Sequence, residues 1–290
     1  MSLNTQVLHT AKQQGRRVQG RYQLKGVEGN GIAPSRVIAG VKAATLARSP
    51  QEKEWAKRIE TLRKLMLLSP EPLTITDYGA GKGAVLDTGS TSDSRTLHTS
   101  IRTLSDMTRS SKNPHWARLL FNVIRSLQPR TAIELGSCVG ISASYQAAAL
   151  ELNGQGGRLV TLEGAEPLAA RSERTLTELG LDKWASVRLG QFADTLPEVL
   201  TELTPVDYAF IDGHHTESAT LDYMEQILPH TSEEAVLVFD DIDWSPGMKK
   251  AWAQIVADPR FALTLDLGTI GFAAVSATST QRQSLKVSYG

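Results

Sequence analysis

The stretch that decides the fold is ELGSCVGIS at residues 134–142, which directly follows PRTAI at residues 129–133. It runs from a strand-like apolar segment through an acidic residue and two glycines into a helix-like segment. RLVTLE at residues 158–163 then forms a second strand-like segment and ends in Glu163, about 20 residues beyond the glycines. A strand, a glycine turn, a helix and a strand that ends in an acid are the pattern of a nucleotide-binding βαβ unit.

A second glycine-rich stretch, ITDYGAGKG at residues 75–83, has a different context. The residues that follow it, 84–115, are rich in serine, threonine and aspartate and show no helical period. Because the strand–turn–helix order fails there, we interpret residues 77–83 as a tight turn, with a role on the substrate side left open. We interpret residues 84–115 as a long loop or a mobile cap segment.

From residue 131 onward, strand-like segments alternate with helix-like ones, which predicts βαβ units and a parallel sheet. The last two strand-like segments, residues 261–267 and 270–276, are joined by a short Gly-Thr turn. So short a connection indicates an antiparallel pair, because a parallel pair needs a crossover. We therefore predict an α/β, Rossmann-like fold with a seven-stranded, mostly parallel sheet whose last strand is antiparallel.

The chain divides into an expected helical N-terminal extension or cap, residues 1–115, and a sheet domain, residues 116–290. The clearest helix of the extension spans residues 51–68, and Trp55 and Met66 lie on its single apolar face. We expect a homodimer, with the Trp55 helix as a candidate interface.

Composition narrows the class of protein. The chain has 290 residues, no net charge and one cysteine, Cys138, so a disulfide framework is excluded. We see no signal-peptide pattern and no apolar run of the roughly 18 residues that a membrane span needs, so we expect a cytoplasmic protein without a membrane partner. Residues 1–115 carry 18 Lys and Arg against 9 Asp and Glu. No nucleic-acid motif accompanies this basic surplus, so no nucleic-acid partner is expected.

A glycine turn of this kind could hold NAD or another nucleoside, but the full G-x-G-x-x-G spacing of an NAD fingerprint is missing. The chain also carries a series of motifs: ELG (134–136), GIS (140–142), VTLEG (160–164), FIDGHH (210–215) and FDDI (239–242). With these motifs, roughly residues 116–276 resemble class I S-adenosylmethionine-dependent methyltransferases, and among them the small-molecule O-methyltransferases of the catechol O-methyltransferase type.

The resemblance implies a binding site for S-adenosyl-L-methionine. It places Glu134 and Gly136 against the methionine part, Ser142 at the carboxylate and Glu163 at the ribose hydroxyls. The two glycines of the turn would let the backbone approach the ligand, and the helix start would favour an anion. Glu134 could instead cap a turn. The full set of expected cofactor-binding residues is Glu134, Gly136, Ser137, Gly140, Ser142, Glu163, Gln191, Phe192 and Asp212, of which Gln191 and Phe192 would border the adenine.

Three acids follow wholly apolar strands: Asp212, Asp240 and Asp241. Carboxylates at the carboxyl ends of neighbouring parallel strands converge in the crevice where open α/β sheets bind ligands. Oxygen ligands without cysteine suit a hard divalent cation such as Mg²⁺, and the resemblance implies a metal at these positions. The alternative is that the acids cap the following helices.

His214 and His215 follow Asp212 in the same loop and are candidates for the base that takes a proton from a hydroxyl group. We favour His214, because its neighbour is better placed to brace the loop. Trp244 and Tyr78 are candidates for the substrate side, although either could be an ordinary packing aromatic.

The function that the sequence predicts is metal-assisted transfer of a methyl group from S-adenosylmethionine to the hydroxyl of a small molecule. A sugar hydroxyl, a phenol and a vicinal diol all fit as acceptors. Three alternatives stay open: an NAD(P)-dependent oxidoreductase, a methyltransferase acting on RNA or protein through the basic extension, and a nucleoside-binding protein without catalysis.

Overall fold

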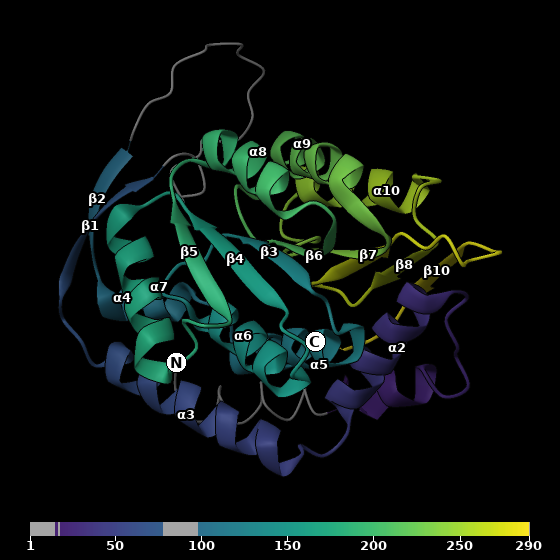
Figure 1. The fold of residues 1–290 in the computed structure, drawn as a ribbon, viewed down its shortest axis with the longest axis horizontal. Helices are drawn as coiled ribbons and strands as arrows, with labels where there is room; N and C mark the ends of the chain where they lie inside the picture. The colour runs from purple at the N-terminus through teal and green to yellow at the C-terminus, as the bar shows by residue number, and fades with distance from the viewer. Residues whose placement is uncertain (1–14, 17, 78–97, 290) are drawn as a thin grey trace.

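A central sheet with helices on both faces forms the body of the molecule (Figure 1). The computed structural model describes residues 15–16, 18–77 and 98–289, so the stretch from Tyr78 to residue 97, with most of the second glycine turn, lies outside the described residues. The elements are α2 (Ile32–Thr45), α3 (Pro50–Leu67), β1 (Pro72–Asp77), β2 (His98–Thr103), α4 (Leu104–Ser110), α5 (Pro114–Leu127), β3 (Thr131–Leu135), α6 (Ile141–Asn153), β4 (Arg158–Glu163), α7 (Glu166–Leu179), β5 (Ala185–Leu189), α8 (Phe192–Leu203), β6 (Val206–Ile211), α9 (Glu217–Ile227), a 3-10 turn (Leu228–His230), β7 (Thr231–Phe239), α10 (Pro246–Ala257), β8 (Leu263–Asp266), β9 (Gly271–Ala274) and β10 (Gln283–Lys286).

Within the described part of the chain, the main sheet has eight strands in the order β10-β8-β9-β7-β6-β3-β4-β5. Of these eight, β9 alone runs antiparallel to its neighbours, β7 and β8. The predicted fold class and the antiparallel pair near the end of the chain are therefore confirmed. The predicted count of seven strands is wrong by one, because β10 adds a short edge strand parallel to β8. Its sequence, QSLK, carries no run of apolar residues, so only its pairing with β8 makes it a strand.

Both faces of the sheet are buried, because helices cover each of them. Along β6, Tyr208 and Phe210 join one apolar cluster, whereas Ala209 and Ile211 join the other. Successive side chains of a strand point to opposite faces, so a strand covered on both sides reads as one apolar run. Helices α8, α9 and α10 lie on one face and α2, α5, α6 and α7 on the other (Figure 1).

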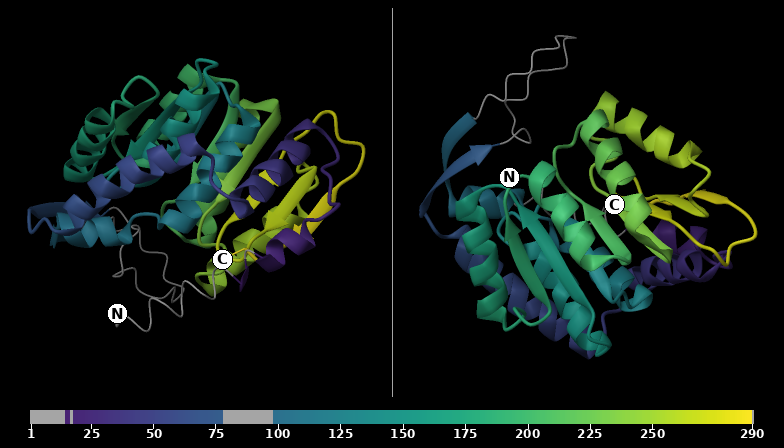
Figure 2. Two further views of the ribbon diagram at one scale, coloured as in Figure 1. Left: turned by 90° about the horizontal axis from the view of Figure 1, so that it is seen from below. Right: turned by 45° about the horizontal axis from the view of Figure 1, so that its top comes forward.

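The N-terminal part packs against the sheet domain through its helices. Trp55, Ile59 and Met66 on α3 are buried within the chain itself, so this face is not available as the dimer interface that the sequence suggested. Beyond α3, residues 98–110 form β2 and α4 and not the predicted loop, because β2 pairs with β1 and Thr103 caps α4. The β1–β2 hairpin lies beside α7 at the outer edge of the molecule (Figure 2).

A buried ion pair joins three of these helices. Arg118 on α5 contacts Glu52 on α3, and both side chains are almost fully buried. The same guanidinium donates hydrogen bonds to the carbonyl oxygens of Ala44 (2.6 Å) and Leu46 (2.9 Å) at the end of α2. Arg118 thus fixes α2 and α3 relative to α5. Among the described helices, none is long and apolar enough to cross a membrane.

Replacement of Arg118 by leucine should lower the free energy of unfolding by about 3–5 kcal/mol, because it removes the buried guanidinium that contacts Glu52. The buried carboxylate then keeps the longer ion pair to the partly exposed Arg48 (3.7 Å). Urea unfolding followed by circular dichroism measures this change. Arg109→Leu is the matched control, since the exposed Arg109 pairs with Asp106 on its own helix, and it should change the value by less than about 0.5 kcal/mol. Equal stabilities of the two variants would contradict the role given to Arg118.

Candidate active site

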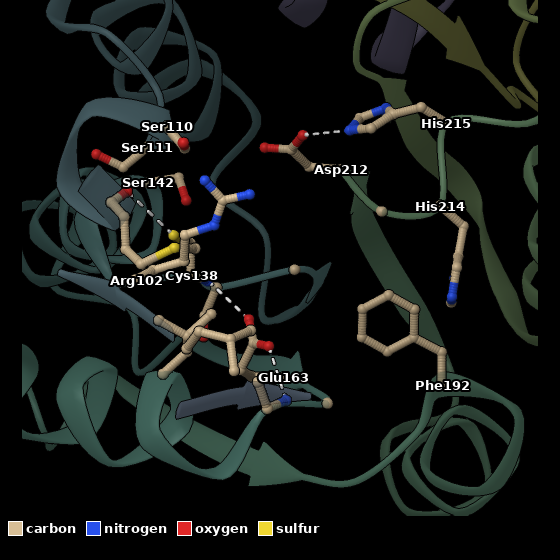
Figure 3. Close-up of a pocket in the computed structure, with 18 of the residues that line it drawn as sticks. Arg102, Ser110, Ser111, Cys138, Ser142, Glu163, Phe192, Asp212, His214 and His215 are labelled. Carbon is tan, nitrogen blue, oxygen red and sulfur yellow. Dashed lines mark hydrogen bonds and ion pairs between the residues drawn. The ribbon is translucent and has the colours of Figure 1, made fainter. Parts of the chain in front are cut away.

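A cavity of about 460 Å³ opens at the carboxyl ends of β3, β4 and β6. The strand order reverses between β3 and β6, and such a reversal is where open α/β sheets bind ligands. The β1–β2 hairpin and α4 supply the opposite wall, from which Arg102 extends toward Asp212 (Figure 3). The residues predicted from the sequence that line this cavity are Gly136, Ser137, Ser142, Glu163, Gln191, Phe192, Asp212, His214, His215 and Trp244.

The turn after β3 needs its glycines for a reason other than the one expected. Gly136 has φ +101°, and a Cβ there would lie 2.3 Å from the carbonyl oxygen of Asp212. Gly140 has φ +83°, does not line the cavity, and a Cβ there would meet Ser172 at 2.8 Å. Both glycines therefore allow close packing of the turn against β6 and α7. Gly136 also lines the cavity, so its predicted role in the approach of a ligand stays a prediction, whereas Gly140 lies away from the cavity.

Glu163 at the end of β4 holds the same turn in place. Its Oε2 accepts a hydrogen bond from the backbone N–H of Cys138 (2.9 Å), and its Oε1 accepts one from Ala165 (3.0 Å). The carboxylate lies at the edge of the cavity (Figure 3). Each carboxylate oxygen can accept a second hydrogen bond, so Glu163 can still receive hydroxyl groups of a ligand.

The wall next to Glu163 offers further polar groups. The Oγ of Ser137 is buried against the cavity and has no hydrogen-bond partner among the described residues. Helix α6 begins at Ile141, and Ser142 in its first turn lines the cavity. A helix N-terminus with unpaired N–H groups favours an anionic group, and the cavity volume lies in the range of small-molecule sites. These residues fit a nucleoside that carries a carboxylate.

His214 faces the aromatic side of the cavity and not the acids. Its Nδ1 lies 2.5 Å from the hydroxyl of Tyr223, and its ring packs edge-on against Phe192, with 5.5 Å between centroids. Figure 3 shows its ring directed toward Phe192, whereas His215 points to Asp212. The preference for His214 as the base is therefore not supported by its position. Phe192 presents a flat apolar surface of the kind that stacks on a base.

Glu134 lies in β3 but does not line the cavity. Its carboxylate is fully buried and accepts hydrogen bonds from Thr161 Oγ1 (2.6 Å) and Gln146 Nε2 (2.7 Å). Burial raises the pKa of Glu134 from 4.5 to about 7, although these hydrogen bonds oppose the shift. The expected contact of Glu134 with the cofactor is thus replaced by contacts inside the protein.

The structure brings two of the three predicted metal ligands together. Single ligand atoms of Asp212, Asp240 and His215 all lie within 4.8 Å of one another. Asp241 is not part of this group, because the chain turns at Asp241 with φ +51°. Asp240 is buried, and burial together with the neighbouring Asp212 charge raises its pKa to about 7.

Lys112, which the sequence analysis missed, stands between these carboxylates. It lies in the linker from α4 to α5, and its Nζ is 3.2 Å from Asp212 Oδ2 and in direct contact with Asp240 Oδ2. Burial would lower the pKa of Lys112, but the charges of Asp212 and Asp240 outweigh it and raise the pKa. Nothing in the local sequence SSKNP marks this lysine, because its partners come 100 and 128 residues later.

This arrangement does not fit a divalent cation at the acids. A metal ion bound by Asp212 and Asp240 would lie within a few ångströms of the Lys112 ammonium. Two unit charges 4 Å apart repel by about 4 kcal/mol at the effective dielectric constant of a protein surface, and a divalent ion doubles that. The Lys112 ammonium thus occupies the position beside both carboxylates that a metal ion would take.

Two aromatic residues, Trp244 and Tyr78, were proposed for the substrate side, and the structure describes the position of Trp244. Trp244 lines the cavity and is 68% exposed, so it stands at the mouth. Tyr78 lies outside the described residues.

Comparisons with known proteins agree with the fold and the motifs. Residues 133–242 match a family model described as a methyltransferase domain. A stretch of 104 residues is 33% identical to a catechol O-methyltransferase of Niastella koreensis, covering 36% of this chain and about half (46%) of that protein. A methyltransferase structure from Geobacter sulfurreducens is similar with a TM-score of 0.50 at 16% identity, covering 59% of this chain and 88% of that one. The family model agrees with the predicted methyltransferase resemblance over residues 133–242, the relative agrees with the catechol type over 104 residues, and the solved structure supports the fold.

Replacement of Glu134 by glutamine should change how stability depends on pH. A carboxyl group whose pKa is raised from 4.5 to about 7 by folding binds its proton more tightly in the folded state. The wild-type protein therefore loses stability as pH rises from 4.5 to 7 and levels off above it. Glu134→Gln removes this loss, so between pH 5 and pH 8 the variant should gain about 2.5 kcal/mol relative to the wild type.

Urea unfolding at several pH values between 5 and 8 measures this difference. Glu173→Gln, on the exposed face of α7, is the control and should follow the wild type. If Glu134→Gln shows the same slope as the control, the buried carboxyl is not the source of the pH dependence.

Proposed function

We propose that this chain, whose residues 133–242 are a methyltransferase domain of the class I type, transfers a methyl group from S-adenosylmethionine to the hydroxyl of a small molecule. The observation that carries the proposal is the cavity at the carboxyl ends of β3, β4 and β6, with Glu163 on one side and Asp212 and His215 on the other. The catechol O-methyltransferase relative supports a hydroxyl group as the acceptor.

The cofactor half of the cavity would work as follows. Glu163 accepts hydrogen bonds from the ribose hydroxyls, and Phe192 with Gln191 borders the adenine. The N-terminus of α6 and the Ser137 hydroxyl hold the carboxylate of the methionine part. S-adenosylmethionine supplies the methyl group on its sulfonium, and S-adenosylhomocysteine leaves after the transfer.

The acceptor half would activate the hydroxyl. His215 takes the proton as the acceptor oxygen attacks the methyl group. Asp212 Oδ1, 3.7 Å from His215 Nε2, stabilises the imidazolium that forms. The metal assistance expected from the sequence is not part of this proposal, because Lys112 contacts both carboxylates that would bind the ion.

This proposal keeps the division of the chain into an N-terminal part, residues 1–115, and a sheet domain, residues 116–290. The first part lines the acceptor side of the cavity through β1, β2 and α4, and we propose that it sets the choice of acceptor. The homodimer and the cytoplasmic location stay predictions.

Calorimetric titration with S-adenosylhomocysteine and with NAD tests the cofactor. We expect S-adenosylhomocysteine to bind, and Glu163→Gln to weaken its binding by about 10- to 100-fold, because a hydrogen bond to a charged group contributes about 1.5–3 kcal/mol. Glu166→Gln, exposed in the first turn of α7, is the matched control and should bind as the wild type does. Binding of NAD without S-adenosylhomocysteine would favour the oxidoreductase.

Steady-state kinetics should distinguish the roles of His214 and His215, the two histidines of the loop. With catechol as the test acceptor, His215→Ala should lower kcat by about 10²–10⁴-fold. His214→Phe keeps a ring against Phe192 and should act mainly on KM for S-adenosylmethionine. A larger loss of kcat in the His214 variant would reverse the assignment.

A further inference from the structure

Lys112 is built into the acid cluster and is not a mobile surface lysine. Its side chain is 11% exposed, that of Asp212 17% and that of Asp240 1%. The two carboxylates come from the ends of the neighbouring strands β6 and β7, whereas the lysine comes from the N-terminal part of the chain. One ammonium therefore joins two strand ends across the floor of the cavity.

The linker that carries Lys112 is fixed by a buried arginine. Arg63 on α3 donates hydrogen bonds to the carbonyl oxygen of Lys112 (2.6 Å) and to Ser111 Oγ (3.2 Å). Ser111 Oγ in turn donates to the carbonyl oxygen of Thr108 (2.6 Å) at the end of α4. Asn113 then caps α5 and holds the other end of the linker. The backbone of Lys112 is thus held on both sides.

The ammonium also has capacity left for a ligand. It carries three N–H donors, of which Asp212 and Asp240 take two. Lys112 lines the cavity together with Asp212 and His215, so a hydroxyl group bound beside these two residues lies within reach of the ammonium. A fixed positive charge next to a developing oxyanion stabilises it without reorganisation.

We propose that the Lys112 ammonium takes the place of a divalent cation in this site and binds the acceptor oxygen directly. The inference rests on the proposed function. Lys112 donates a hydrogen bond to the acceptor hydroxyl and stabilises the negative charge that develops on its oxygen, while His215 receives the proton. Asp212 and Asp240 hold the ammonium in position, and methyl transfer requires no metal ion.

Binding of Mn²⁺ to the protein tests the position of the ammonium without any turnover. Titration followed by electron paramagnetic resonance of free Mn²⁺ compares the wild type with Lys112→Ala. Removal of the ammonium leaves two carboxylates and a histidine within 4.8 Å, so Lys112→Ala should bind Mn²⁺ at least about tenfold more tightly than the wild type. Lys112→Ala combined with Asp240→Asn should lose the gain, and the exposed-site control Lys64→Ala should match the wild type.

Turnover of catechol gives an independent readout. The wild-type rate of S-adenosylhomocysteine formation should be the same with EDTA and with added Mg²⁺. Lys112→Ala should lower kcat by about 10²–10³-fold, move the pH–rate profile to more alkaline pH, and regain part of its rate with Mn²⁺.

Two results would overturn the proposal. One is equal affinity for Mn²⁺ in the wild type and in Lys112→Ala. The other is a wild-type rate that falls in EDTA and is restored by added Mg²⁺. If Lys112→Ala does not fold by circular dichroism, Lys112→Met and the wild-type measurements decide in its place. A protein that fails to bind S-adenosylhomocysteine would defeat the proposed function, whereas the Mn²⁺ comparison would still report on the cation position.

Discussion

The contact between the turn after β3 and the end of β6 is the constraint on which the site depends. The N–H of Asp212 donates to the carbonyl oxygen of Leu135, and a side chain at Gly136 would collide with the Asp212 carbonyl. The N–H of Gly136 donates to Leu162 at the end of β4. These bonds hold three strand ends side by side, and the cavity is the space that opens above them.

The negative charge of Asp212 and Asp240 is partly offset by Lys112, which comes from a distant part of the chain. Burial alone would favour the neutral forms of Asp240 and Lys112, but each stabilises the charged form of the other. A buried ion pair of this kind contributes little net stability, because desolvation offsets the attraction. Its effect is to fix one cation at one place, and a fixed cation is what a developing oxyanion requires.

The N-terminal part contributes both structure and chemistry. Its helix α3 packs Trp55 and Ile59 into the body of the protein, and from the same helix Arg63 holds the linker of Lys112. Arg118 and Glu52 fasten α2 and α3 to α5 at the other end. The extension therefore forms part of the site, because it supplies one wall of the cavity and the Lys112 ammonium.

The sequence by itself determined the alternation of strands and helices, the glycine turn, and the acids at the strand ends, because strand period and turn chemistry are local properties. It therefore predicted Glu163, Asp212 and His215 at one edge of the sheet. Only the tertiary structure decided that Glu134 faces the interior, that His214 turns toward Phe192 and that β10 joins the sheet. It alone brought Lys112 to Asp240 across 128 residues, because a contact of that sequence separation depends on how α3, α4 and α5 pack and leaves no periodic mark in the chain.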